Sequence, residues 1–307
     1  MSAGWTAGAV RARAIARRRA GEATARRCAT SDDTSEALRM LAGTTYGRRL
    51  HPGLSLEAAE HAIEMTLLWN LRVLAGWQPR AGARLLRIVV CGYEAADIVA
   101  RMRELGGGEA GTPYELGALA TAWPSVRRAA TAAEVRRALA ASPWGDPGAE
   151  DPATIAFFLQ LSGALRLAAL GPEAARWAAG DAAVAVAREV YLAGRRIDDA
   201  AARVAAKLLG SAPAKPQSWE SYLQHLPHDA RWALEGVSSP DELWRAEAAC
   251  RLRKEADSRE LLRRGGLGPG PVLAAAMLLC VDAWRVCAAL EAAARSERAA
   301  EVFDAVA

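Results

Sequence analysis

The sequence has few of the residues that build β-sheets or catalytic centres. Only 6% of its 307 residues are aromatic and only four are histidines, while 52% are hydrophobic and alanine supplies much of that share. Alanine has the highest helix propensity and buries little area per residue, so this composition favours many closely packed helices over a sheet. The 14 prolines lie mostly between the Ala/Leu/Arg-rich stretches. We therefore predict an all-α protein.

Motifs for nucleophilic, phosphate-binding or zinc chemistry are also missing. The five cysteines form no CxxC pair and no zinc-ligand spacing, and no GxSxG motif occurs. The glycine-rich residues 265–270 are not followed by the Lys-Ser/Thr of a P-loop. An odd number of cysteines without a signal peptide favours the reducing cytoplasm. The sequence therefore predicts a cytoplasmic protein that is not an enzyme.

Two short motifs could bind a metal but are incomplete. Asp198-Asp199 begins like the magnesium motif of α-helical isoprenoid synthases, yet no third acid follows, so too few oxygen ligands remain. His225 and His228 could share a metal, but Pro227 breaks the helical spacing and no third ligand is near in sequence. We expect no metal and no cofactor. The aspartates are expected to cap a helix or lie on the surface.

The most apolar run of the chain is expected to form a buried helix. Residues 267–281 are apolar, but Asp282 and Arg285 interrupt the run. Its helical part before the charges is about ten residues, whereas a membrane span needs about 20. Six tryptophans lie within apolar helical patterns and are expected to anchor the core. They are Trp69, Trp77, Trp177, Trp232, Trp244 and Trp284.

Positive charge is concentrated near the start of the chain, although the net charge is only +4. Residues 10–27 contain seven arginines and one acid, Glu22, and a helical projection spreads the arginines nearly all round. Such a segment could bind nucleic acid or an anionic membrane, or could be a solvated helix whose arginines meet acids elsewhere. The arginines are Arg11, Arg13, Arg17, Arg18, Arg19, Arg26 and Arg27.

Internal repetition is the most informative feature. Residues 36–47 and 134–145 share a glutamate, a Leu-Ala pair, a hydroxyl residue, an aromatic residue and a glycine at identical spacing. Each segment predicts an amphipathic helix, closed by an aromatic side chain that packs back and a glycine free to adopt positive φ. The aromatic–glycine pairs are Tyr46-Gly47 and Trp144-Gly145.

A second pattern recurs with a similar period. Glu94 begins a helical stretch with Arg103 nine residues later, and Asp198 does the same with Lys207. Asp282 opens a third apolar stretch. A period of about 100 residues exceeds that of solenoid repeats, which indicates that whole helical units were multiplied. We predict three helical domains, residues 1–106, 107–210 and 211–307.

Taken in order, these motifs resemble the C/d-subunit family of V-type ATPases. Residues 10–15 are similar to its first helix, and residues 41–47 resemble its L-x-x-T-x-Y element, with a degenerate copy at 139–145. Residues 93–103 and 197–207 resemble its aromatic-Asp-x-x-Asn-Leu…Arg helix, and residues 268–282 resemble the Gly-Pro-x-Pro turn and acidic helix of its third domain. The candidate structural or interface residues on these motifs are Arg11, Arg13, Tyr46, Tyr93, Glu94, Asp97, Arg103, Trp144, Asp198, Lys207 and Asp282.

The resemblance implies three similar helical-bundle domains in a pseudo-threefold, cone- or funnel-shaped arrangement. It also implies a non-catalytic protein at the cytoplasmic face of the membrane, where the tip of the central stalk enters the funnel and the rotor ring lies beneath. A protein of this kind links ATP hydrolysis or synthesis to proton or sodium transport. The expected partners are the central-stalk and rotor-ring proteins of the ATPase, with no small-molecule substrate and no nucleic acid.

The chain departs from the family pattern at several positions. Glu94 replaces the family's Asp, Asp97 and Ala201 replace its Asn, and Glu291 stands where a basic residue is expected. Residues 292–296 replace a Gly-Lys pair. These changes remove or alter hydrogen-bonding side chains, so contact with the stalk or the ring is expected to differ. A helical module that binds nucleic acid or anionic membrane through its arginines is the alternative function, and an isoprenoid-synthase-type enzyme is a third.

Overall fold

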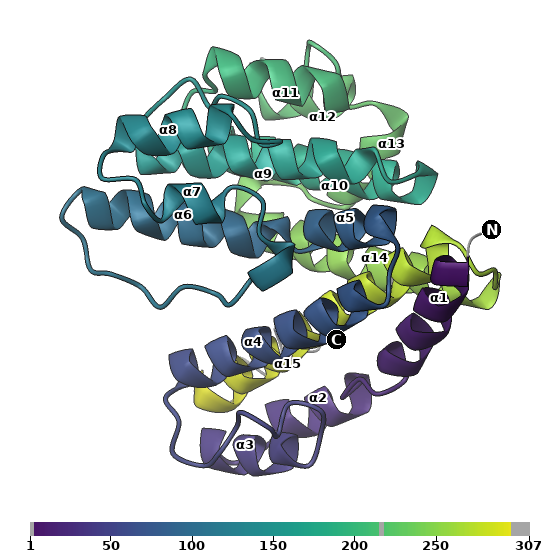
Figure 1. Ribbon diagram of the computed structural model, residues 1–307. Helices are drawn as coiled ribbons and strands as arrows, with labels where there is room; N and C mark the ends of the chain where they lie inside the picture. The colour runs from purple at the N-terminus through teal and green to yellow at the C-terminus, as the bar shows by residue number, and fades with distance from the viewer. Residues whose placement is uncertain (1–2, 215–217, 296–307) are drawn as a thin grey trace. The chain divides into compact units, whose positions relative to one another are not determined.

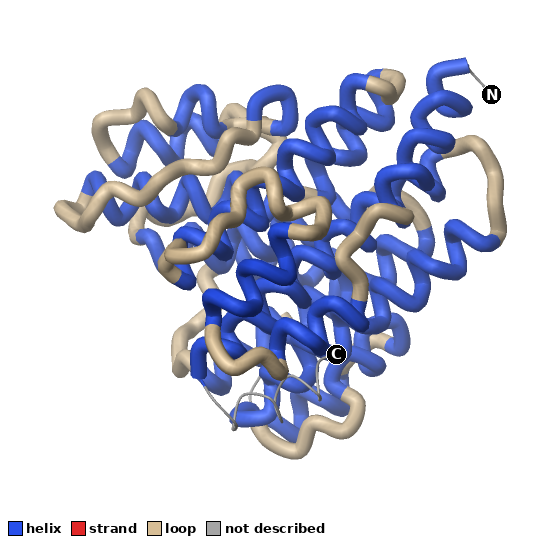
Figure 2. Tube along the Cα trace, turned by 90° about the horizontal axis from the view of Figure 1, so that it is seen from below, coloured by secondary structure: helices blue, strands red, loops and turns tan. Residues whose placement is uncertain are grey.

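The computed structural model describes residues 3–214 and 218–295, and every regular element in this part of the chain is helical (Figures 1 and 2). The predicted all-α class is therefore confirmed. Contacts divide the chain into two compact units, unit 1 with residues 1–86 and 251–307, and unit 2 with residues 87–250. Unit 1 thus unites the two ends of the chain. The division into three domains and their pseudo-threefold arrangement stay predictions.

Unit 1 is built around one long helix, α15. This helix contacts α1, α2, α3 and α4, and Figure 1 shows it running alongside α4. Two helices, α5 and α14, run from one unit into the other along the chain. The bounds are α1 (Ala3–Ala16), α2 (Glu22–Ala29), α3 (Thr34–Ala42), α4 (Leu56–Gly76), α5 (Arg80–Val89), α14 (Leu243–Arg263) and α15 (Pro269–Arg295).

Helix α15 contains the most apolar run of the sequence and is largely buried, as predicted. Asp282 and Arg285 interrupt the apolar run but lie inside the 27-residue helix, and they are only 2% and 1% exposed. Both charges have partners, so burying them does not break the helix. By length and composition α15 could cross a membrane, yet 78% of its most apolar window is buried in the structure. Residues 292–296 stand where the family pattern has a Gly-Lys pair, and of these Ser296 lies outside the described residues.

Unit 2 has two hydrophobic clusters. The larger one surrounds α10 and includes Leu161, Val186 and Tyr222, while the smaller one includes Ile98 and Leu139. Helix α9 contacts α10, α6 and α11. The bounds are α6 (Cys91–Leu105), η1 (Gly117–Leu119), α7 (Trp123–Val126), α8 (Ala132–Ala140), α9 (Pro152–Ala168), α10 (Pro172–Ala187), the π-helix η2 (Arg188–Leu192), α11 (Asp199–Leu209), α12 (Trp219–His225), α13 (His228–Arg231), η3 (Trp232–Leu234) and η4 (Pro240–Glu242).

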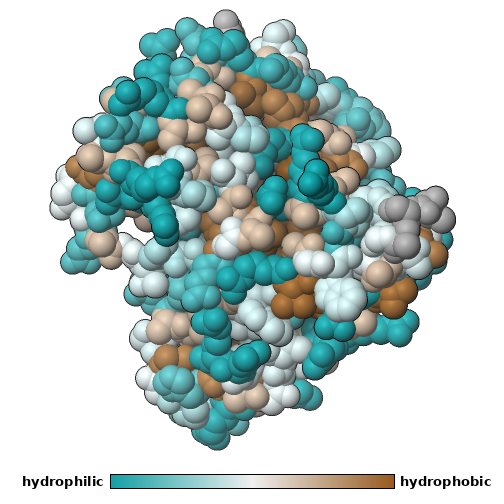
Figure 3. Space-filling model, in the orientation of Figure 1, coloured by the Kyte–Doolittle hydropathy of each residue, from teal (hydrophilic) through white to brown (hydrophobic). Residues whose placement is uncertain are grey.

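The prediction that the tryptophans anchor the core is partly wrong. Trp177 is fully buried, whereas Trp69, Trp77 and Trp244 are 39%, 52% and 39% exposed. An arginine guanidinium lies over each of these three rings, at 5.2 Å, 5.5 Å and 5.2 Å from the ring centre. Cation–π contact lets a large ring remain at the surface. On the face drawn in Figure 3, hydrophobic areas are separated by hydrophilic side chains.

The two matched segments adopt the same local structure. Both α3 and α8 have nine residues, and each begins with a side chain that accepts the backbone N–H three residues later, Asp33 from Glu36 and Thr131 from Glu134. Each glutamate then accepts a backbone N–H just before its helix, as in a capping box. The hydroxyl residue donates back to Leu41 or Leu139 and accepts the N–H of the aromatic residue.

The glycines that end the two segments serve different needs. Gly145 has φ of 87°, as predicted. Gly47 is not among the glycines with positive φ; instead, a Cβ placed there would lie 1.9 Å from the carbonyl oxygen of Ala42. Backbone atoms cannot move away cheaply, so glycine is required at position 47 by close approach rather than by conformation.

We predict that Gly47→Ala destabilises the protein by at least about 2 kcal/mol, because the new methyl group overlaps a backbone carbonyl. Gly43→Ala is the matched control, since its Cβ would meet no atom closer than 3.4 Å and its φ is −78°. Urea unfolding followed by circular dichroism measures both variants. Equal stability of the two variants would contradict the proposed overlap.

Candidate functional site

Asp282, at the centre of α15, joins three distant parts of unit 1. Its carboxylate accepts the backbone N–H groups of Ala20 and Gly21 at 3.1 and 2.8 Å, just before α2 begins. It also accepts the hydroxyl of Tyr46 at 2.9 Å. Both Asp282 and Tyr46 are buried, at 2% and 3% exposed. We call this arrangement the Asp282 clamp.

Glu94, in the first turn of α6, makes the equivalent arrangement in unit 2. One carboxylate oxygen accepts the N–H groups of Thr121, Ala122 and Trp123 at 2.5–2.8 Å, where α7 begins. The other accepts the indole N–H of Trp144 at 3.0 Å. Both side chains are 2% exposed. We call this arrangement the Glu94 clamp.

The two clamps share one physical plan. In each, a buried carboxylate from one helix accepts the free N–H groups at the start of another helix, which otherwise lack partners. The same carboxylate accepts the aromatic donor that follows the capping-box helix α3 or α8. Hydrogen bonds to a charged group contribute about 1.5–3 kcal/mol each, which offsets the cost of burying the carboxylate. Each clamp therefore holds three segments of its unit around one carboxylate.

Asp97 lies one turn after Glu94 and is 4% exposed. It accepts the backbone N–H of Tyr114 at 3.0 Å, and the Tyr114 ring meets Tyr93 edge-on with centroids 5.0 Å apart. Burial raises the pKa of Asp97 to about 7, and the nearby charge of Glu94 adds to this rise, while the N–H of Tyr114 opposes it. Near neutral pH, Asp97 is therefore protonated in a large fraction of molecules.

The remaining motif acid, Asp198 of the second copy, does not form a clamp in the described part of the chain. Asp198 is the N-cap of α11 and accepts the N–H of Ala201 at 2.7 Å, as expected for a capping aspartate. The basic residues that follow two of the motif acids, Arg103 and Lys207, are exposed. No hydrogen bond or ion pair of either side chain occurs within the described residues.

The arginine-rich start is not one continuous helix. Helix α1 ends at Ala16 and α2 begins at Glu22, so residues 17–21 divide it. Four of the seven arginines are engaged inside unit 1, which favours fixed roles over a free polybasic arm. Arg11 lies over Trp77, Arg13 donates to Gly266 O at 2.7 Å, Arg19 donates to Ala16 O at 2.7 Å, and Arg26 pairs with Glu22 at 3.2 Å.

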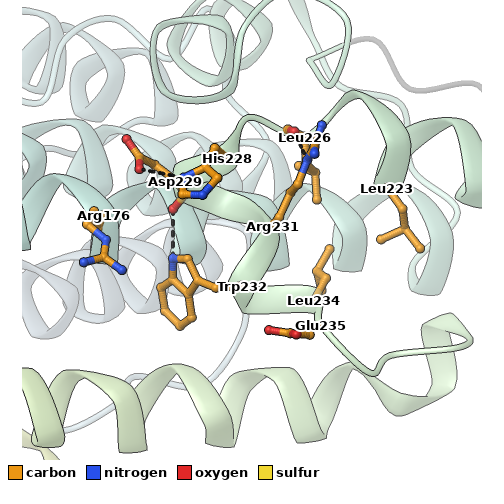
Figure 4. Close-up of a pocket in the computed structure, with 9 residues that line it drawn as sticks. All are labelled: Arg176, Leu223, Leu226, His228, Asp229, Arg231, Trp232, Leu234 and Glu235. Atoms are coloured by element: carbon orange, nitrogen blue, oxygen red, sulfur yellow. Dashed lines mark hydrogen bonds and ion pairs between the residues drawn. The ribbon is translucent and has the colours of Figure 1, made fainter.

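Of the two histidines considered as metal ligands, His228 lines a cavity of about 450 Å³ in unit 2 (Figure 4), whereas His225 is not one of its lining residues. His228 points toward Asp229, with Nδ1 and Oδ1 3.6 Å apart, and the indole of Trp232 donates to the Asp229 carbonyl at 2.8 Å. Nδ1 of His225 lies 2.7 Å from the carbonyl oxygen of Ser221. Among the described residues, no group of three or more His, Cys, Asp or Glu side chains could hold a metal.

Sequence reasoning missed one buried ion pair. Arg285 donates to Glu255 at 2.5 Å, and both side chains are almost fully buried. The signal was the pair of charges, Asp282 and Arg285, within an apolar helix, because charged residues are rarely buried without partners. The partner of Arg285, Glu255, lies in another helix, α14, so the signal could not name it.

No family model matches this sequence, and no curated protein matches it.

We predict that Tyr46→Phe lowers the free energy of unfolding by about 1–3 kcal/mol, because the buried Asp282 loses its side-chain donor. Tyr191→Phe is the control, since its hydroxyl donates to Ser218 O at an exposed position and its loss is expected to cost under about 0.5 kcal/mol. Chemical denaturation measures both. If Tyr46→Phe is as stable as the control, the Asp282 clamp does not have the energy assigned to it.

We predict that Asp97→Asn is increasingly stabilising as pH rises. The pKa of Asp97 is higher in the folded protein than in the unfolded chain, so native stability falls as pH rises from roughly 4 to 8. The amide keeps the acceptor for Tyr114 without the charge, so its advantage should grow by roughly 1–3 kcal/mol over that interval. Denaturation at pH 5 and pH 8 tests this. Exposed Asp32→Asn is the control, and a pH-independent difference for Asp97→Asn would refute the prediction.

Proposed function

We propose that this chain is a non-catalytic subunit of a V-type rotary ATPase that couples the central stalk to the membrane rotor ring. The observation that carries the proposal is the pairing of motif residues in the clamps. Tyr46 and Trp144 belong to one family-like motif, and Asp282 and Glu94 belong to another. In both units the aromatic of the first motif donates to the acid of the second.

Similarity of short motifs along the sequence does not require the motifs to contact each other in the folded protein. The partners are 236 residues apart in one clamp and 50 in the other, and the acid follows the aromatic in one and precedes it in the other. Short linear similarity does not place such residues together. The recurrence therefore supports the resemblance to the C/d-subunit family.

Two departures from the family pattern are chemically mild. Glu94, in place of Asp, still accepts four hydrogen bonds through its two oxygens. Asp97, in place of Asn, has its pKa raised to about 7 by burial, so its protonated form resembles the neutral amide. Both substitutions keep the hydrogen-bonding capacity that the motif needs.

The proposed role is mechanical. A coupler between stalk and ring must transmit torque without deforming, and each clamp holds three segments of its unit around a buried charge. In this proposal the protein lies at the cytoplasmic face of the membrane, binds the stalk and ring proteins, and has no substrate of its own. The ion moved is a proton or sodium.

Arg103 and Lys207 are the motif residues best suited to touch these partners. Both are exposed and have no side-chain partner within the described residues. An exposed cation without an intramolecular partner can pair with a carboxylate on another protein at little cost in desolvation. In the third motif copy this position is Glu291, which pairs with Arg295 at 3.2 Å instead.

We predict that the tagged full-length chain, expressed in its own host, co-purifies with the central-stalk and rotor-ring proteins of a V-type ATPase. The double variant Arg103→Ala/Lys207→Ala should recover these proteins several-fold less well, because two contact charges are lost. The double variant Arg128→Ala/Arg196→Ala removes the same charge from other exposed positions and should behave as the wild type. Quantitative mass spectrometry of the eluates is the measurement.

A chain that elutes alone from a host with an intact V-type complex would overturn the proposed function. Equal loss in both double variants would leave the complex in place but remove the roles assigned to Arg103 and Lys207.

A further inference from the structure

Unit 1 contains a cleft of about 550 Å³ between the end of α1 with the following residues and the last turns of α14. Five arginines line it: Arg13, Arg17, Arg19, Arg259 and Arg263. None of the described residues that line the cleft is acidic. This concentration of positive charge cannot be read from one segment of the sequence, because three of the arginines lie in residues 13–19 and two in residues 259–263.

The carboxylates near the cleft are already engaged. Glu255 is buried and accepts both Arg259, at 2.7 Å, and Arg285, at 2.5 Å. Asp282 accepts the donors of the Asp282 clamp. Glu260 pairs with Arg263 at 2.5 Å and also with Arg264. Guanidinium groups therefore outnumber the carboxylates around the cleft.

Three of the lining arginines have no acidic hydrogen-bond partner among the described residues. Arg13 and Arg19 donate to backbone carbonyls, and the exposed Arg17 makes no side-chain hydrogen bond or ion pair there. Burial lowers the pKa of Arg19; the charges of Arg259 and Arg285 also lower it, whereas Asp282 and Glu255 oppose the shift. A partly desolvated cation beside like charges is a favourable place for an anion.

We propose that this cleft binds a compact polyanion with adjacent phosphate groups. Five arginines line a single cleft of about 550 Å³, so the matching ligand carries several negative charges close together. A lone carboxylate brings one charge, whereas linked phosphates bring several, with oxygens that suit the planar fork of arginine. Leu262 and Leu278 add a small apolar wall. The inference is independent of the proposed coupling role.

Arg17 and Arg18 provide a matched pair of variants for the test. Both are exposed and adjacent in sequence, and neither side chain has a partner within the described residues, but only Arg17 lines the cleft. Isothermal titration calorimetry of the full-length protein with tripolyphosphate at low salt is the measurement. We expect saturable binding with one site, weakened about tenfold by Arg17→Ala and less than about twofold by Arg18→Ala. Circular dichroism checks that both variants fold.

Orthophosphate and a single-stranded oligonucleotide distinguish the alternatives. Tighter binding of tripolyphosphate than of orthophosphate supports a site for linked phosphates. Equal weakening by Arg17→Ala and Arg18→Ala would indicate diffuse charge attraction and overturn the proposal. The proposal would also be overturned if tripolyphosphate does not bind at millimolar concentration. The same holds if the oligonucleotide binds and tripolyphosphate does not displace it.

Discussion

A buried carboxylate that accepts the free N–H groups at the start of another helix is the interaction on which this structure depends. Burying a charge is costly unless hydrogen bonds replace its water. Asp282 and Glu94 meet this condition by joining helix starts to an aromatic donor. The buried carboxylate needs hydrogen-bond donors, and the free N–H groups at the helix starts need acceptors. Removing the acid would leave several donors unsatisfied at once.

The same principle explains how α15 can be both apolar and charged. Its central charges, Asp282 and Arg285, are among the least exposed polar residues of the protein, and each meets partners from other segments of unit 1. The N-terminal segment supplies donors to Asp282, while Glu255 of α14 accepts from Arg285. Polar contacts thus tie the two ends of the chain into one unit around an otherwise hydrophobic helix.

Several features were predictable from local pattern. The all-α class follows from composition, and the start of α8 follows from the capping-box spacing of Thr131 and Glu134. The equivalence of α3 and α8 follows from identical spacing of a few residues. The exposure of Trp77 was not predictable, because an apolar helical pattern does not reveal that Arg11 lies over the ring. The reason for a glycine at position 47 was not predictable either, because it is the close approach of the Ala42 carbonyl oxygen.

By itself, then, the sequence determined the helical class, the capped start of α8 and the shared local structure of two segments. These properties depend on residues within a few positions of one another, so propensity and spacing decide them. Only the tertiary structure decided that Tyr46 meets Asp282, that Trp144 meets Glu94 and that five arginines line one cleft. Packing of distant helices selects such partners, and no local preference encodes which buried donor will find which acceptor.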